Sequence, residues 1–264
     1  MEQIKKLREM TGAGIGDCKK ALDESQGDIE KAVEILRKKG IAKAAKRGDK
    51  EASEGVVKLS VNESGDEGYI LEMSAETDFV VRNEKFQGFS DRVLEIIKNK
   101  KPANLDELMN INMENGTVKE SLDSLSGTIG EKMEIKRFEI LTGATVAAYS
   151  HIGGKIGVLV SLDKSGEKEM AYDIAMHIAA ADPKYITSSE VPEEETNKEK
   201  EIYKEQLLKE GKPENIIDNI LTGKINKYFS EVCLVDQEYI KDDKKKVKDI
   251  LGEIKVDKFV RYSL

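Results

Sequence analysis

The chain has 264 residues, a formal net charge of −8 at pH 7, 39% hydrophobic residues and 36% charged residues. The length predicts about two or three structural units, and the apolar content is enough for folded domains, which excludes a disordered chain. The negative charge argues against nucleic acid as the main partner, because phosphate binding requires concentrated positive charge.

The sequence also gives no sign of a membrane or secreted protein. No run approaches the roughly 20 apolar residues that span a bilayer, and Met1 is followed by a charged helical segment rather than a signal peptide. The two cysteines, Cys18 and Cys233, form neither a disulfide framework nor a metal-ligand cluster. We therefore expect a cytoplasmic protein that uses no metal and no cofactor.

Residues 1–54 are predicted to form a small helical domain and a linker. Apolar residues recur at helical spacing in three short segments, which Gly12 and Gly27 separate. Asp28 is a good N-cap for the third segment. Three helices with glycine turns and one small core indicate a bundle of the ubiquitin-associated type. The charged stretch 43–54, rich in small residues, is predicted to be the linker.

Residues 55–140 change to the period of a mixed α+β unit. Alternating apolar residues predict a strand over 57–61, and a polar turn leads to a second strand over 69–75. Two helices are expected next, the first capped by Asn83 and the second ending at Gly130. A third strand, with a break in its register, closes the unit.

The same plan then appears a second time. Strands are predicted over 145–149 and 156–162, with a helix after them. Gly68-Tyr-Ile-Leu-Glu-Met73 and Gly157-Val-Leu-Val-Ser-Leu162 occupy matching places, which indicates a duplicated strand–strand–helix unit. The copies differ most after the second strand, where the first copy alone carries Ser74-Ala-Glu-Thr-Asp-Phe-Val-Val81. We expect function in a segment that the fold does not require.

The rest of the chain predicts a projecting hairpin and a return to the core. Pro192 and Pro213 each open a charged helical stretch, and Gly211 suits the turn between them. The apolar positions are too few to bury both helices, which favours an antiparallel coiled-coil hairpin. The predicted units of this α+β fold with antiparallel sheets are a helical domain and linker (1–54), core subdomain N (55–140), the first part of core subdomain C (141–189), the hairpin (190–228) and the return to core subdomain C (229–264).

No arrangement of residues predicts catalysis. His151 and His177 are the two histidines of the chain, they fall in different predicted elements, and no His/Cys spacing fits zinc. Gly12, Gly14 and Gly16 resemble a dinucleotide fingerprint superficially, but the preceding strand and the correct spacing are missing. We therefore expect a protein that is not an enzyme.

Two segments carry a specific likeness. The first is Leu7-Arg-Glu-Met-Thr-Gly-Ala-Gly14 together with Asp17-Cys-Lys-Lys-Ala-Leu22. The second is Glu76-Thr-Asp-Phe-Val80 with Phe86-Gln-Gly-Phe89 after it, at the end of a predicted strand. Together they resemble the elongation factor Ts family, and weaker matches extend the likeness over essentially the whole chain.

The resemblance implies a guanine nucleotide exchange factor that binds the GTPase elongation factor Tu in its GDP form. Such a factor disturbs the Mg²⁺ and phosphate site of the GTPase and promotes GDP release, so that GTP can bind again during translation elongation. The resemblance implies that Asp78 and Phe79 reach the magnesium and switch region of the partner, with Thr77 and Val80 beside them in the segment that dislocates Mg²⁺. The residues implied to support exchange are Lys19, Ile129, Gly130 and His151.

Other interpretations of the same residues stay open. By themselves, Thr77 and Asp78 indicate a helix cap, and Phe79 and Val80 indicate a local core contact. The whole chain also fits a binding module for another acidic or helical partner, which would not change nucleotide release, and, with less support, a hydrolase that depends on a histidine. A homodimer, a 2:2 assembly with the GTPase and the loss of a C-terminal helical module all stay open. Direct contact with nucleic acid or a membrane is not expected.

Overall fold

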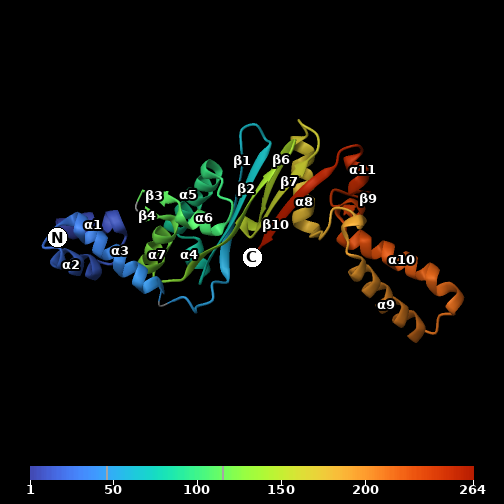
Figure 1. The fold of residues 1–264 in the computed structure, drawn as a ribbon, viewed down its shortest axis with the longest axis horizontal. Coiled ribbons are helices and arrows are strands. Elements are labelled where there is room, and N and C mark those ends of the chain that lie inside the picture. The colour runs from blue at the N-terminus through green and yellow to red at the C-terminus, as the bar shows by residue number, and fades with distance from the viewer. Residues whose placement is uncertain (46, 115) are drawn as a thin grey trace.

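The computed structural model describes residues 1–45, 47–114 and 116–264. Over these ranges the molecule is elongated, with a helical bundle at one end, two three-stranded sheets in the middle and a helical hairpin at the other end (Figure 1). Every strand pair in these sheets is antiparallel. The predicted α+β class with antiparallel sheets is therefore confirmed.

The N-terminal bundle follows from local sequence signals. It consists of α1 (Glu2–Thr11), α2 (Ile15–Glu24) and α3 (Ile29–Ala45). α1 ends at Gly12, whose φ of 70° lies in the left-handed region that glycine adopts without strain. The Asp28 carboxylate accepts the N–H of Lys31 at 3.1 Å at the start of α3, as an N-cap should. α3 continues into the predicted linker 43–54, and residue 46 of that linker lies outside the described residues.

The first sheet and its helices form one half of the core. The elements are β1 (Glu54–Val61), β2 (Glu67–Ala75), α4 (Asp78–Val81), α5 (Glu84–Lys100), α6 (Leu105–Asn110), β3 (Asn112–Met113), β4 (Gly116–Thr117), α7 (Val118–Ile129) and β5 (Met133–Thr142). The strand order is β1-β2-β5, and the β2–β5 pairing shifts register at Glu72/Met73, which confirms the predicted break in register. The sequence pattern does not predict α4, α6 or the β3–β4 ribbon, because each is too short to show a period.

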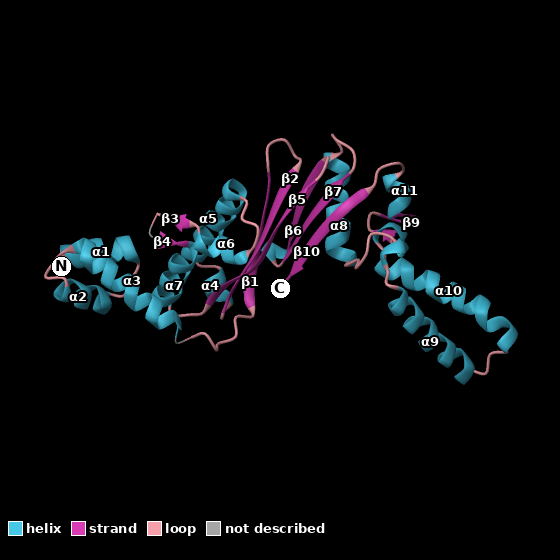
Figure 2. Cartoon of the chain, viewed as in Figure 1, coloured by secondary structure: helices cyan, strands magenta, loops and turns pink. Residues whose placement is uncertain are grey.

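The second sheet repeats this order of elements. Its parts are β6 (Thr145–His151), η1 (Ile152–Gly154), β7 (Ile156–Leu162), α8 (Lys168–Ala181) and β10 (Val256–Ser263). The strand order is β10-β7-β6, so in both sheets the strand that precedes a long helix is central (Figure 2).

The two sheets approach each other closely at the paired glycines. A Cβ on Gly68 in β2 would lie 3.0 Å from a methyl carbon of Leu159, and a Cβ on Gly157 in β7 would lie 2.4 Å from a methyl carbon of Val57. Each glycine therefore leaves room for a side chain of the opposite sheet. The matching glycines of the two motifs are explained by this mutual packing.

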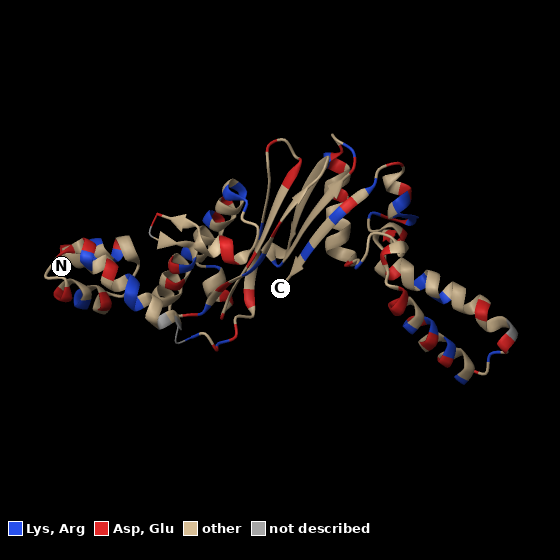
Figure 3. Cartoon of the chain, viewed as in Figure 1, with Lys and Arg blue, Asp and Glu red and all other residues tan. Residues whose placement is uncertain are grey.

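The hairpin leaves and re-enters the second half at adjoining positions. It consists of α9 (Glu193–Lys209) and α10 (Glu214–Val232), which contact each other and project from the core (Figure 1). Pro192 and Pro213 are the N-cap residues, one position before the predicted first turn. At the root, Tyr185 forms a β-bridge with Cys233. Acidic and basic residues are interspersed along both helices (Figure 3).

Short elements flank the hairpin on both sides. The 3-10 turn η2 (Ser188–Glu190) precedes it. The chain then returns to the core through η3 (Leu234–Asp236), β8 (Glu238–Tyr239), β9 (Asp242–Lys246) and α11 (Val247–Leu251). α11 ends three positions before the predicted Ile254, and the β8–β9 ribbon is not predicted by the sequence.

Candidate partner-binding site

The one-turn helix α4 follows β2 and is capped by Thr77. The Thr77 hydroxyl oxygen accepts the N–H of Val80 at 3.4 Å. The Thr77 N–H and hydroxyl both donate to the Glu131 carboxylate, at 3.1 and 2.9 Å. The helix-cap interpretation of Thr77 is therefore confirmed, and the same side chain ties α4 to the turn after α7.

Phe79 lies outside the core, while its neighbours lie inside. Its side chain is 81% exposed, whereas Val80 and Val81 are 6% and 9% exposed and pack in the first-half core. Successive helix residues point in directions about 100° apart, so a single turn that buries Val80 and Val81 directs Phe79 to solvent. The interpretation as a local core contact is right for Val80 and wrong for Phe79.

Asp78 is held beside Phe79 but stays accessible. Its carboxylate lies 3.0 Å from the Arg82 guanidinium, one turn later, and its side chain is 44% exposed. An ion pair between exposed side chains is weak, because solvent screens it. The Asp78 carboxylate can therefore exchange its partner when another molecule approaches.

The loop that carries α4 is braced by a second acidic residue. The Glu76 carboxylate accepts the backbone N–H of Lys132 and a guanidinium N–H of Arg47, each at 2.6 Å. The Lys132 N–H, followed by the Arg47 guanidinium, lowers the pKa of Glu76 below its usual range. Glu76 and the Thr77–Glu131 contact therefore fix both the start of the loop and its helix cap.

Ile129 and Gly130 shape the turn that supplies this support. Gly130 ends α7 with a φ of 89°, and Ile129 is partly buried against the first-half core. Glu131, which binds Thr77, comes directly after them. The structure thus brings Ile129 and Gly130 next to the α4 loop, as parts of its support.

His151 lies at the end of β6, on the same end of the core as α4. Its ring nitrogen Nδ1 is 3.0 Å from the Tyr149 hydroxyl oxygen, and its side chain is exposed. The turn after it is tied to β1, because the Lys155 amine lies 2.5 Å from the Glu54 carboxylate. Glu54 in turn pairs with Ala75, at the end of β2 where the α4 loop begins.

Ile152, next to His151, is an exposed apolar residue that the sequence pattern does not predict. Ile152 is 67% exposed and has a φ of 49°, a left-handed conformation that is strained for a β-branched residue. Its hydrophobicity predicts burial, and no local motif signals its backbone conformation.

Lys19 does not belong to this end of the core. It lies on the exposed side of α2 in the bundle, away from the α4 loop in sequence. The bundle nevertheless contacts the helices near the α4 loop, because the Lys85 amine and a methyl group of Thr128 lie next to Gly12 at the end of α1. Lys85 and Thr128 belong to α5 and α7, the helices next to α4 and Ile129.

The second histidine has a structural role. His177 has no exposed surface, its Nε2 is 2.9 Å from the Gln237 side-chain oxygen, and its Nδ1 accepts the N–H of Ile240 at 3.3 Å. Burial lowers the pKa of His177 below its usual value. A side chain without exposed surface cannot reach a substrate, so the hydrolase interpretation receives no support from His177.

Over residues 1–45, 47–114 and 116–264, no group of three or more His, Cys, Asp or Glu side chains is placed to hold a metal ion. No helix in the described ranges has the length and apolar character needed to cross a membrane.

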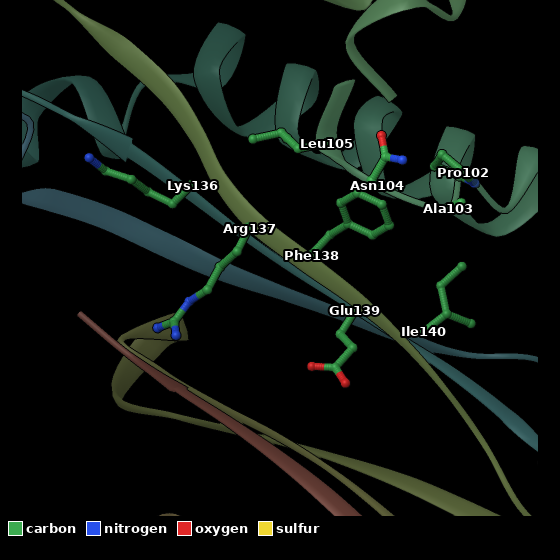
Figure 4. A pocket seen from close by; sticks show the side chains of 9 residues that line it. All are labelled: Pro102, Ala103, Asn104, Leu105, Lys136, Arg137, Phe138, Glu139 and Ile140. Carbon is green, nitrogen blue, oxygen red and sulfur yellow. The ribbon is translucent and has the colours of Figure 1, made fainter. Parts of the chain in front are cut away.

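A cavity of about 350 Å³ lies between the edge strand β5 and residues 102–105 at the start of α6 (Figure 4). Phe138 lies beside Asn104, while Arg137 and Glu139 point to the other side of the strand. The Arg137 guanidinium bonds the Glu72 carboxylate at 2.7 Å and covers the Tyr262 ring at 4.0 Å. Its charge is thus already engaged within the fold.

Known proteins resemble this chain over most of its length. The family model described as Elongation factor TS matches residues 76–264. A curated protein named Elongation factor Ts, from Chlorobium phaeobacteroides (strain BS1), is 44% identical over 278 residues. That alignment covers 99% of this chain and 96% of the relative.

Proposed function

The chain belongs to the elongation factor Ts family of translation elongation factors, and from that premise we propose that it is a guanine nucleotide exchange factor for elongation factor Tu. It binds the GDP form of the GTPase, disturbs the Mg²⁺ and phosphate site, and lets GDP leave so that GTP can bind. It acts in the cytoplasm as a binding protein rather than as an enzyme, and it needs no cofactor.

Exchange of this kind requires a difference in affinity. The factor must bind the nucleotide-free GTPase more tightly than the nucleotide-bound GTPase, and this difference sets how far it shifts the equilibrium. The coupling is reciprocal, so incoming nucleotide weakens the binding of the factor by the same ratio. Each ~1.4 kcal/mol removed from the barrier to GDP release accelerates release about tenfold.

The exposed side chain of Phe79 carries the proposal. An aromatic ring that is 81% exposed on a braced loop contributes little to the stability of its own fold. Burying it in a partner is worth about 1.5–3 kcal/mol. Insertion between packed side chains of the GTPase also displaces them, because protein interiors tolerate little intrusion. Phe79 is therefore proposed as the wedge.

The neighbouring residues have assigned parts in the same mechanism. The accessible Asp78 carboxylate disturbs the polar network around the Mg²⁺ of the partner. Thr77, as the cap of α4, and Val80, packed in the core, hold Phe79 in position. Ile129 and Gly130 place Glu131 against Thr77. Two further residues are proposed to support the contact with the partner: His151, at the same end of the core as α4, and Lys19, on the bundle.

The arrangement of units is part of the proposal. The bundle is a ubiquitin-associated-type domain, the two sheets with their helices are related subdomains N and C, and α9–α10 is a coiled-coil insertion in the second. The repeated strand order and the paired glycines support this division.

The test follows fluorescent GDP as it leaves elongation factor Tu. Phe79→Ala should slow factor-stimulated release at least tenfold, because it removes the wedge and leaves the loop intact. A matched control is Ile202→Ala, which removes a side chain that is 40% exposed on the hairpin and should leave release unchanged. If Phe79→Ala matches the parent chain, Phe79 is not the wedge. If the parent chain itself has no effect on release, the proposed function is wrong.

A further inference from the structure

Helices α3 and α7 touch through their backbones. Gly40 in α3 and Gly127 in α7 are both buried, and a Cβ built on Gly127 would lie 2.2 Å from the Gly40 carbonyl oxygen and 2.4 Å from the Gly40 Cα. A Cβ on Gly40 would lie 3.3 Å from the Ser124 carbonyl oxygen. No side chain fits at Gly127 unless α3 moves away.

A charged contact fixes the same two helices near the start of α7. An Arg37 guanidinium nitrogen lies 2.5 Å from a Glu120 carboxylate oxygen. The same oxygen accepts the N–H of Thr117 at 2.9 Å and closes the capping box of α7. The Thr117 N–H, and then the charge of Arg37, lowers the pKa of Glu120. The bundle therefore rests along α7 from its first turn to its last.

α7 also leads to the α4 loop. Its C-terminus passes through Gly130 to Glu131, and the Glu131 carboxylate holds Thr77 beside Phe79. One helix therefore carries the bundle on its side and braces the wedge at its end. This helix therefore helps to set the position of the bundle relative to the wedge, together with the linker, whose Arg47 bonds the Glu76 carboxylate at 2.6 Å.

We infer that Gly40 and Gly127 are positioning residues for nucleotide exchange, because their contact fixes the bundle as a second binding arm at a set distance from Phe79. The inference rests on the proposed function. Two contacts on one rigid body reinforce each other, since binding at one raises the effective concentration of the other and no ordering cost remains. A loosened bundle loses that advantage, although the wedge itself stays intact.

Gly127→Ala tests the inference through the concentration dependence of exchange. The concentration of factor that gives half-maximal GDP release should rise about tenfold, while the limiting rate at saturation stays within about twofold of the parent. Alanine is a better helix former than glycine, so helix propensity does not account for a loss. Gly40→Ala, with its wider spacing, should give a smaller rise. Gly223→Ala on α10, where a Cβ meets no atom within 4 Å, is the matched control and should change nothing.

A double-mutant cycle with Lys19→Ala measures the coupling between the bundle contact and the Gly40–Gly127 contact, which a general loss of stability would not change. Lys19→Ala should raise the half-maximal concentration in the parent chain and have a much smaller effect in the Gly127→Ala chain, because the arm is already displaced. Equal effects of Lys19→Ala in both chains, zero included, overturn the inference. So does a Gly127→Ala chain with the half-maximal concentration of the parent.

Folding and the proposed function are checked separately. Circular dichroism and thermal melting show whether Gly127→Ala is folded, and if it is not, the result for Gly40→Ala decides. If the parent chain does not accelerate GDP release from elongation factor Tu, the proposed function is wrong. If the parent chain accelerates GDP release and the glycine variants accelerate it equally well, the inference alone is wrong.

Discussion

The two halves of the core have the same strand order and differ after the central strand. In the first half, residues 76–83 join β2 to α5 and form the helix turn that exposes Phe79. In the second half, residues 163–167 join β7 to α8, and Asp163 exchanges bonds with the backbone of Lys255, donating its N–H at 3.0 Å and accepting at 2.8 Å. One scaffold therefore closes the same connection either with a polar turn or with an exposed aromatic residue.

This difference separates what the fold needs from what it carries. The second half shows that a polar turn is enough to connect a central strand to its helix. The first half adds two acidic braces, Glu76 and Glu131, to a loop whose most hydrophobic side chain lies in solvent. A loop that is braced to hold a side chain outside its own core is built for contact with another molecule.

The largest expected effect contrasts two phenylalanines of the first half. Phe86 has no exposed surface, so Phe86→Ala should lower the free energy of unfolding by about 3–5 kcal/mol. Phe79→Ala should change it by less than about 0.5 kcal/mol, because the ring is exposed. Urea denaturation of both variants measures the contrast. A Phe79→Ala chain that loses stability on the scale of Phe86→Ala would place Phe79 in the core and remove the distinction between the halves.

A smaller effect is expected when the brace of the α4 loop is weakened. Thr77→Val keeps the shape of the side chain but removes the cap of α4 and the hydroxyl bond to Glu131, at a cost of about 1–2 kcal/mol. It should slow GDP release less than Phe79→Ala, because the wedge remains but is held less firmly. Thr222→Val is the control, since the Thr222 hydroxyl donates to the Asp218 carbonyl at 3.0 Å on the exposed surface of α10. Equal stability of the two variants would show that the brace has no energetic role.

The smallest effect distinguishes the halves by pH. Burial lowers the folded-state pKa of His177 on α8 below the usual value of 6.5, so the unfolded chain binds the proton more readily. The contribution of neutral His177 to the free energy of unfolding is therefore fully present above pH ~7 and is lost as the pH falls below 6.5. Its size is about 1.4 kcal/mol for each pH unit by which the folded-state pKa lies below the unfolded-state pKa.

Hydrogen exchange at pH 7.5 and pH 5.5 measures this directly. Amides of β7 should lose protection at the lower pH before those of β2 do, and His177→Gln should abolish the difference. The neighbouring Tyr239 stays neutral over this range, because its ordinary pKa of 10 lies well above pH 7.5 and burial raises that pKa further. Equal loss of protection in both sheets would assign the pH response elsewhere.

Much of the fold could be predicted because its signals are local. Gly12, Asp28, Asn83 and Gly130 each act at a helix end, and the structure has a cap or a helix terminus at every one of them. The two similar motifs at Gly68 and Gly157 predict the repeated strand–strand–helix unit, whereas the order of the strands within each sheet comes from the structure. Hydrophobic periodicity does not predict α4, α6 or the β8–β9 ribbon, because these elements are too short to show a repeating pattern.

The features that define the candidate site depend on distant parts of the chain. An apolar residue such as Phe79 is expected to be buried, and only the packing of Val80 and Val81 shows that it is not. A glycine inside a helix, as at Gly40 or Gly127, indicates only a weaker helix until the second helix is seen beside it. The family resemblance predicts Thr77 to Val80 as functional residues, whereas hydrophobic periodicity alone does not.

The root of the hairpin has a consequence for how this protein can vary. Tyr185 and Cys233 lie side by side, and the Leu234 N–H donates to the Tyr185 carbonyl at 2.9 Å. Glu195 bonds the hydroxyls of Tyr185 and Tyr228 just above this junction. Because the departing and returning strands of chain are joined there, insertions or deletions farther along the hairpin leave the sheets undisturbed. We therefore expect the length of the hairpin to vary among relatives more than the contacts of the junction that anchors it.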